Sequence, residues 1–284
     1  MSFSIVHLSD IHFGYVADLQ KVVAVQNLIP DLEPDVTVLS GDLTLRSRHG
    51  EFQAARLLVQ ELERTAPVFV IPGNHDVQWW LRPFIPFGSR VKYRKFRYHF
   101  GPILTPTLDL TEAIIASIQT AHGIAWSSLT LRLRDLAVKG HLPRLEARRV
   151  KTLFDKARPD QARVLVLHHN VLRGKLSKRM GLAHWKRAHR RIVDTGVEVV
   201  LCGHDHHENV DVLDGVVVSC AGTISQLSRN GRPSTFHRIC IEDDSIKVEV
   251  YLWEQKHRTF KRSDVMVFAR RRTVNEPEVT AGAV

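Results

Sequence analysis

The 284-residue chain has few cysteines and no long apolar run, and each absence excludes a class of protein. Its three cysteines, Cys202, Cys220 and Cys240, are an odd number in strand-like apolar segments, which excludes a disulfide framework and favours a reducing compartment. The longest apolar runs, such as residues 164–167, are too short to span a bilayer. No basic leader or cleavable apolar stretch begins the sequence, so we expect no signal peptide and a cytoplasmic location.

Acidic residues are missing from two stretches of a chain whose composition is otherwise that of a soluble globular protein. Residues 82–97 and 173–191 together hold fourteen lysines and arginines and no acid, so they exceed the whole formal charge of +10. Such a field attracts phosphate esters, nucleic acid or anionic lipid headgroups, but a solvated face that aids solubility would have the same composition. Peripheral contact with the inner membrane through these residues therefore stays open.

Short apolar runs alternate with helical patterns along most of the chain. Strands are predicted at residues 5–8, 36–39, 68–71, 113–118, 162–167 and 197–201, and helices at residues 19–28 (ending at Pro30), 50–64, 143–157 and 185–193. This alternation is typical of an α/β protein with a buried, largely parallel sheet. Later short strands, at residues 216–220, 236–241 and 246–253, suggest a second sheet with antiparallel edges packed against the first.

We expect one domain over residues 1–271. Residues 79–111 and 171–183 break the alternation, and we interpret them as insertions that form a small basic cap rather than part of a sheet. Residues 272–284 lack apolar periodicity and are predicted to form a flexible tail.

Clusters of Asp, Asn and His directly follow five of the apolar runs. They are Asp10-Ile11-His12, Gly41-Asp42, Gly73-Asn74-His75-Asp76, His168-His169 and Gly203-His204-Asp205-His206. In a parallel sheet these positions gather at the carboxyl ends of the strands. Oxygen and imidazole ligands without thiolate suit Mn, Fe or Zn, and seven of them are too many for one tetrahedral site but enough for two ions.

Two neighbouring divalent ions are suited to hydrolysing phosphate esters, because they acidify a bridging water and bind phosphoryl oxygens. Asp42, alone after its strand, is the best candidate for a carboxylate that bridges both ions. Asp10 and His12 alternate and so can face one ion, while Asn74 can give an amide oxygen to the other. His204 and His206 alternate in the same way.

The ordered motifs Asp-x-His, Gly-Asp, Gly-Asn-His-Asp, His and Gly-His-x-His, over residues 10–206, resemble those of the calcineurin-like metallophosphoesterase superfamily. Asp42-Leu43-Thr44 with Glu51-Phe52 and Ala54-Ala55 is similar to the bacterial branch that includes class III cyclic-nucleotide phosphodiesterases. The resemblance implies a four-layer αββα sandwich with two divalent metal ions.

The resemblance also implies a role for each motif residue. Asp10, His12 and His206 would bind the first ion, Asn74, His168 and His204 the second, and Asp42 both. His75 would protonate the leaving oxygen, and Asp76 would orient the His75 imidazole. His169 could contact substrate, support a ligand or replace His168 as the ligand, and Arg82 and Arg90 are candidate substrate contacts.

The leading prediction is a metal-dependent phosphodiesterase in which a metal-bridging hydroxide attacks phosphorus. Within that class, a cyclic nucleotide competes with the pyrophosphate bond of a nucleotide-linked lipid A precursor of the UDP-diacylglucosamine type. A nucleic-acid binding protein or nuclease, using the basic and aromatic run at residues 92–100, is a less favoured alternative. The sequence does not indicate the oligomeric state.

Overall fold

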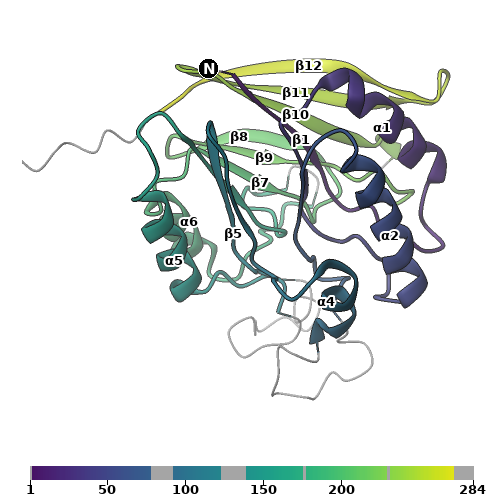
Figure 1. Cartoon of the computed structure of the whole chain (residues 1–284), viewed down its shortest axis with the longest axis horizontal. Coiled ribbons are helices and arrows are strands. Elements are labelled where there is room, and N and C mark those ends of the chain that lie inside the picture. The colour runs from purple at the N-terminus through teal and green to yellow at the C-terminus, as the bar shows by residue number, and fades with distance from the viewer. Residues whose placement is uncertain (1, 78–91, 123–138, 175–176, 229–230, 272–284) are drawn as a thin grey trace, which may run out of the picture.

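The computed structural model describes residues 2–77, 92–122, 139–174, 177–228 and 231–271, and these form two six-stranded sheets with helices on their outer faces (Figure 1). The first sheet has the order β12-β11-β10-β1-β2-β3 and consists of β1 (Phe3–Leu8), β2 (Val36–Leu39), β3 (Val68–Val70), β10 (Thr235–Ile241), β11 (Ser245–Glu254) and β12 (Thr259–Ala269). The second has the order β4-β5-β6-β7-β9-β8 and consists of β4 (Thr107–Asp109), β5 (Ala113–Ser117), β6 (Ala162–Val166), β7 (Val199–Cys202), β8 (Asn209–Leu213) and β9 (Val216–Cys220). The described helices are α1 (Leu19–Leu32), α2 (His49–Leu62), α4 (Arg94–Phe100), α5 (Arg144–Phe154) and α6 (Trp185–Val193).

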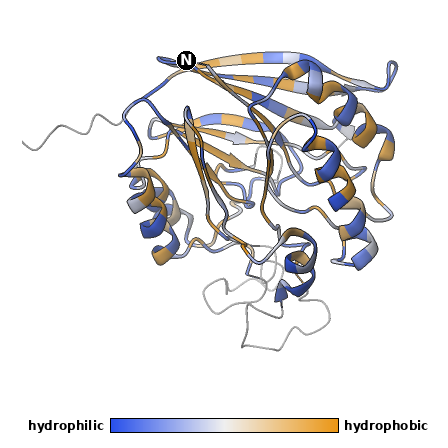
Figure 2. Cartoon of the chain, in the orientation of Figure 1, coloured by the Kyte–Doolittle hydropathy of each residue, from blue (hydrophilic) through white to orange (hydrophobic). Residues whose placement is uncertain are grey.

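The central strands are almost wholly apolar because both faces of each sheet are covered there, whereas edge strand β12 is polar and largely exposed. On β1, Ile5 points into the layer between the sheets, whereas Val6 packs with residues of α1 and α2. On β6, Val164 points into that shared layer and Leu165 packs against α5 and α6. Figure 2 shows apolar strands inside and helices whose outer sides are polar. The result is a four-layer αββα sandwich, as the motif resemblance predicted.

Parallel pairing places the ends of the central strands at common edges. In the first sheet β1, β2 and β3 are parallel, and in the second β5, β6, β7 and β9 are parallel. The antiparallel strands lie toward the sheet edges: β10, β11 and β12 extend the first sheet, and β4 and β8 are the edge strands of the second.

Three sequence predictions about the elements were wrong. The C-terminal strands do not form a sheet of their own, because β9 joins the second sheet while β10 and β11 extend the first. Helix α1 continues through Pro30 to Leu32 and ends where Glu33 adopts a left-handed conformation with φ of 43°. Residues 107–109, assigned to the cap, form β4 and pair with β5.

The remainder of the expected cap is described only in part. Helix α4 packs on α2 through the edge-to-face contact of Phe96 with Phe52. Residues 78–91, which include Arg82 and Arg90, lie outside the described residues, as does the predicted tail at 272–284. No helix in the described part of the chain has the length and apolarity required to cross a bilayer.

Candidate metal centre

All five polar clusters lie in loops that follow parallel strands, so the topology collects them at one edge of the sandwich. Asp10 follows β1, Asp42 follows β2 and Asn74 follows β3, while His168 follows β6 and His204 follows β7. The two sheets therefore each contribute ligand candidates to the same place.

Four side chains form the first group of candidate ligands. One ligand atom from each of Asp10, His12, Asp42 and His206 lies within 4.8 Å of the others. The Nε2 atoms of His12 and His206 are 3.0 Å apart, and His206 Nε2 is 3.3 Å from Asp10 Oδ1. His12 Nε2 lies 3.7 Å from Asp10 Oδ1 and 3.8 Å from Asp42 Oδ2.

The second group shares Asp42 with the first. His168 Nε2 lies 3.3 Å from Asp42 Oδ2 and 3.0 Å from Asn74 Oδ1. His204 Nδ1 is 2.9 Å from the same Asn74 oxygen and 3.3 Å from His168 Nε2. Asp42 Oδ2 thus lies beside both groups, which is the position that a bridging carboxylate requires.

These spacings fit divalent ions. Nitrogen and oxygen ligands about 2.0–2.2 Å from one ion lie roughly 3–4 Å from each other, close to the distances above. Asp10 Oδ1 is buried, and no hydrogen bond to it is formed by the described residues. The donor set is oxygen and imidazole only, which suits Mn, Fe or Zn.

Backbone strain is concentrated on the same residues. Five of the seven candidate ligands have left-handed φ angles, which are uncommon for residues with a side chain; they are Asp10 (54°), His12 (52°), Asp42 (52°), His204 (75°) and His206 (57°). Strain of this kind is retained where the surrounding structure enforces it, and it clusters at functional sites.

Two glycines allow the loops to approach one another. A Cβ atom on Gly73 would collide with the side chain and backbone of Asp42, and one on Gly203 would collide with Ser9 and Asp10. The glycines of the Gly-Asn-His-Asp and Gly-His-x-His motifs are therefore required by packing around the two carboxylates.

A second set of hydrogen bonds orients the candidate ligands. Asp10 Oδ2 accepts hydrogen bonds from Ser9 Oγ at 2.6 Å and from the His204 backbone N–H at 2.8 Å. His168 Nδ1 lies 2.9 Å from the Ser40 carbonyl oxygen, so Nδ1 carries the proton and Nε2 is directed toward Asp42. Partners of this kind fix the tautomer and the orientation of a ligand.

The electrostatics of the cluster favour charged carboxylates. Burial opposes the charge on Asp10, but the close approach of the His12 and His206 imidazoles outweighs burial and holds the pKa of Asp10 well below its usual range. Burial likewise opposes the charge on Asp42, yet the positive field of His168 keeps the pKa of Asp42 below its ordinary value.

The pKa values of the two imidazoles of the second group shift in opposite directions. Burial disfavours the charged form of His168, but the Asp42 charge outweighs burial and raises the pKa of His168 to about 9. Burial and the charge of His168 lower the pKa of His204 to about 3. Because a nitrogen ligand must be deprotonated, ion binding in the second group would be coupled to loss of the His168 proton.

His75 and Asp76 lie beside the ligand groups, but they do not pair as expected. His75 packs edge-to-face on His12 with ring centroids 4.8 Å apart, and its Nδ1 lies 2.8 Å from the Leu45 carbonyl oxygen. Asp76 instead accepts hydrogen bonds from the backbone N–H groups of Leu43, Thr44 and Gly73 and from the Thr44 hydroxyl.

The expected orientation of His75 by Asp76 is therefore corrected: a backbone carbonyl fixes this ring. Asp76 joins the loop after β2 to the loop after β3, and its burial, together with the Asp42 charge, raises its pKa to about 6. The sequence carried no signal for the Leu45 carbonyl, because every residue has one.

His169 is buried behind the second group and is not one of its ligand candidates. Its Nδ1 lies 2.8 Å from the Thr120 hydroxyl, and its ring packs 4.5 Å from that of His204. His168, rather than His169, has a ring nitrogen beside Asp42 and Asn74. The hydroxyls of Ser9 and Thr120 and the Ser40 carbonyl were missed by the sequence analysis, since isolated hydroxyl residues and backbone carbonyls have no distinguishing pattern.

Comparison of the sequence with known proteins identifies one family. Residues 3–208 match the family model described as calcineurin-like phosphoesterase. A probable cyclic nucleotide phosphodiesterase of Moraxella catarrhalis (strain BBH18) is 27% identical over 72% of the chain and 72% of its own length. A glycerophosphodiester phosphodiesterase of Enterobacter lignolyticus (strain SCF1) is 30% identical over 47% of the chain and 52% of its own length.

Solved structures agree on the fold. A purple acid phosphatase from yellow lupin seeds superposes with a TM-score of 0.69 at 11% identity, over 95% of this chain and 54% of that one. A dimetal phosphatase from Danio rerio superposes with a TM-score of 0.66 at 9% identity, over 95% of this chain and 99% of that one.

Proposed function

Because the chain belongs to the calcineurin-like phosphoesterase family, we propose that it is a phosphodiesterase that holds two divalent metal ions at the strand ends. Asp10, His12 and His206 would hold one ion and Asn74, His168 and His204 the other. The observation that carries this proposal is that one Asp42 oxygen lies beside both groups, 3.8 Å from His12 Nε2 and 3.3 Å from His168 Nε2.

Bound ions would supply an acidified bridging water and neutralise charge on the phosphoryl group. The chain supplies the rest. Asp42 holds the two groups at a fixed separation, and its Oδ1 accepts a hydrogen bond from the His75 backbone N–H at 2.8 Å. The Leu45 carbonyl accepts the hydrogen bond of His75 Nδ1–H, so a second proton carried on Nε2 is the one that the imidazolium ring would give to the departing oxygen.

For the substrate we favour a phosphodiester of the nucleotide type, since the Moraxella relative is named for cyclic nucleotides. The glycerophosphodiester relative and the lipid-linked pyrophosphate hypothesis name the other substrates to compare. Arg82 and Arg90, the candidate substrate contacts, lie outside the described residues, so the lipid-linked hypothesis stays a prediction. Turnover of a cyclic nucleotide, a glycerophosphodiester and UDP-diacylglucosamine, measured side by side, ranks the three.

The structure supports the nucleic-acid alternative less than the sequence did. Of the aromatic residues at 92–100, Tyr93 and Phe96 are 2% and 1% exposed and cannot stack on bases, whereas Tyr98 is 78% exposed. Salt-dependent retention of DNA by the purified protein would favour this alternative.

The activity test uses an aryl phosphodiester in buffer containing Mn²⁺. Asp42→Ala and Asn74→Ala should each reduce turnover to background, because both remove a ligand from the second group. Lys156→Ala, an exposed position after α5, is the control and should keep the wild-type rate. Unchanged turnover in Asp42→Ala would refute the proposal.

Metal content provides a test that does not depend on activity. Elemental analysis after loading with Mn²⁺ should find about two ions per chain in the wild type, as expected of a dinuclear site. Asp10→Ala and Asn74→Ala should each lose about one ion, because each belongs to a single group. Equal loss of both ions in these two variants would contradict the division into two groups.

A further inference from the structure

A basic groove lies between α5 and α6 on the outer face of the second sheet, and the proposed phosphodiesterase chemistry does not use it. It has a volume of about 520 Å³, and Arg144, Arg148, Lys151, Arg191 and Asp194 are among its lining residues. Arg191 and Asp194 lie at the end of α6 that leads into the start of β7, whereas His204 follows the end of β7. None of the residues that line the groove is a ligand candidate of the metal centre.

Three arginines of the groove have no acidic partner among the described residues. Arg144 and Arg148 are exposed on one side of α5, and no ion pair joins either of them to a described carboxylate. Arg191 is fixed by a hydrogen bond from its Nη1 to the Leu142 carbonyl at 2.7 Å, which positions its guanidinium but does not neutralise it. By contrast Arg149, on the same helix but outside the groove, pairs with Glu146 at 3.0 Å.

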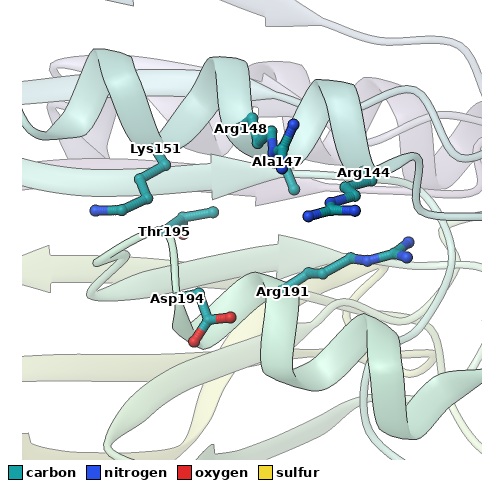
Figure 3. A pocket seen from close by; sticks show the side chains of 7 residues that line it. All are labelled: Arg144, Ala147, Arg148, Lys151, Arg191, Asp194 and Thr195. Atoms are coloured by element: carbon teal, nitrogen blue, oxygen red, sulfur yellow. The ribbon is translucent and has the colours of Figure 1, made fainter.

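The charges are unequal along the groove. Figure 3 shows Arg144 and Arg191 extending toward one another from facing helices, with Lys151 and Asp194 toward the other end. Lys151 is already paired with Asp155 at 2.9 Å, so the surplus positive charge is concentrated at the arginine end.

This arrangement matches a particular kind of ligand. Neighbouring like charges repel, so the arginine end is stabilised by an anion, and planar guanidinium groups bind phosphate oxygens in pairs. The volume lies within the range of small-molecule sites. Lys151 and Asp194 offer a donor and an acceptor to the uncharged part of a ligand. We propose that the α5–α6 groove binds a small soluble organic phosphate whose phosphate groups lie between Arg144, Arg148 and Arg191.

Calorimetry on the full chain tests the proposal, with ADP and inorganic pyrophosphate as probes. A chelator in the buffer removes divalent ions and so prevents turnover, and about 0.15 M salt screens diffuse attraction. The test variant is Arg144→Gln/Arg148→Gln. The matched control is Arg187→Gln/Arg190→Gln, which removes the same charge from exposed positions of α6 that do not line the groove.

The wild type should bind ADP saturably, and the test variant should raise the dissociation constant at least about tenfold because it removes two charged hydrogen-bonding partners. The control should stay within about twofold of the wild type, and both variants should keep the wild-type rate on an aryl phosphodiester. Arg191→Gln, tested separately, should weaken binding as well.

Three results would overturn the proposal: no saturable binding of either probe, equal weakening in test and control variants, or unchanged binding in both Arg144→Gln/Arg148→Gln and Arg191→Gln. Vesicles of phosphatidylglycerol distinguish a lipid headgroup from a soluble ligand. For a lipid headgroup, the protein would sediment with these vesicles in a way that depends on Arg144 and Arg148, while the soluble probes would not bind. That result would identify the ligand of the groove as a lipid headgroup on a membrane surface and not a soluble phosphate.

Discussion

At the scale of single residues, the candidate centre depends on unusual backbone conformations as much as on side-chain chemistry. Asp42 has a φ of 52° and meets both ligand groups only because its loop turns in this way. The neighbouring His75 has its Nδ1 directed to the Leu45 carbonyl, so a main-chain atom determines which ring nitrogen can transfer a proton.

We predict that His75→Gln lowers turnover according to the leaving group. An alkyl phosphodiester needs a proton on its departing oxygen and should lose about 10²–10⁴-fold in turnover, the usual contribution of a general acid. A p-nitrophenyl phosphodiester leaves as a stable anion and should lose much less. The measurement is kcat for both substrates with metal content confirmed as unchanged; equal losses would show that His75 is not the proton donor.

At the scale of elements, α4 packs against α2 and stabilises it, and is not a free basic surface. Phe96 is 1% exposed and contacts Phe52 of α2 and Phe100 of α4 itself, with ring centroids 6.3 and 5.1 Å away. Lys95 donates a hydrogen bond to the Ser47 carbonyl at 2.8 Å, which ties α4 to the loop between the Asp42 motif and α2. The basic and aromatic composition of this segment thus reflects packing on one side and solvation on the other.

The contribution of α4 to the free energy of unfolding is measurable. Phe96→Ala should lower the free energy of unfolding by about 3–5 kcal/mol, since it leaves a cavity among buried aromatic rings. Tyr98→Ala, at a side chain that is 78% exposed on the same helix, should change it by less than about 0.5 kcal/mol. Urea unfolding of both variants gives the comparison, and similar values for the two would show that α4 does not pack as described.

At the scale of the whole molecule, a chain of polar side chains crosses the layer between the two sheets. His7 Nε2 lies 2.9 Å from Ser40 Oγ and its Nδ1 lies 3.2 Å from Ser219 Oγ, which in turn lies 2.8 Å from His237 Nδ1. Burial lowers the pKa of His237 to about 3, and burial together with the charge of His237 lowers that of His7 well below its ordinary value. Both imidazoles are therefore neutral in the folded protein at mildly acidic pH.

This layer makes stability depend on pH. Below about pH 6.5 the unfolded chain protonates His7 and His237 while the folded chain does not, so the free energy of unfolding falls as pH decreases, by up to about 1.4 kcal/mol per pH unit for each histidine. In buffer with a chelator, His237→Gln should reduce the slope of the free energy of unfolding against pH. Between about pH 6 and 4.5 the reduction should equal the contribution of one histidine, up to about 1.4 kcal/mol per pH unit. Thr37→Val, which changes a buried polar group that does not titrate, should leave the slope as it is. An unchanged slope in His237→Gln would contradict the assignment.

Much of the fold was predictable because the central strands are buried on both faces and therefore appear as apolar runs. The continuation of α1 through Pro30 was not, since tertiary packing of Ile29 and Leu32 outweighs the local preference of proline. The membership of β4 and of β10 to β12 in particular sheets was not predictable either, because a strand pattern does not specify its partner.

The sequence by itself determined the family and the order of the ligand candidates, because each motif follows its own strand and parallel strands end at one edge. Only the tertiary structure decided how the groups between those motifs are used. It assigned the Leu45 carbonyl to His75 and Asp76 to two backbone loops, and it separated Arg149, which pairs with Glu146, from Arg144, which pairs with no acid in the described part of the chain. The physical reason is that hydrogen bonds and ion pairs join atoms far apart in the chain, so their partners are fixed by the approach of loops and helices.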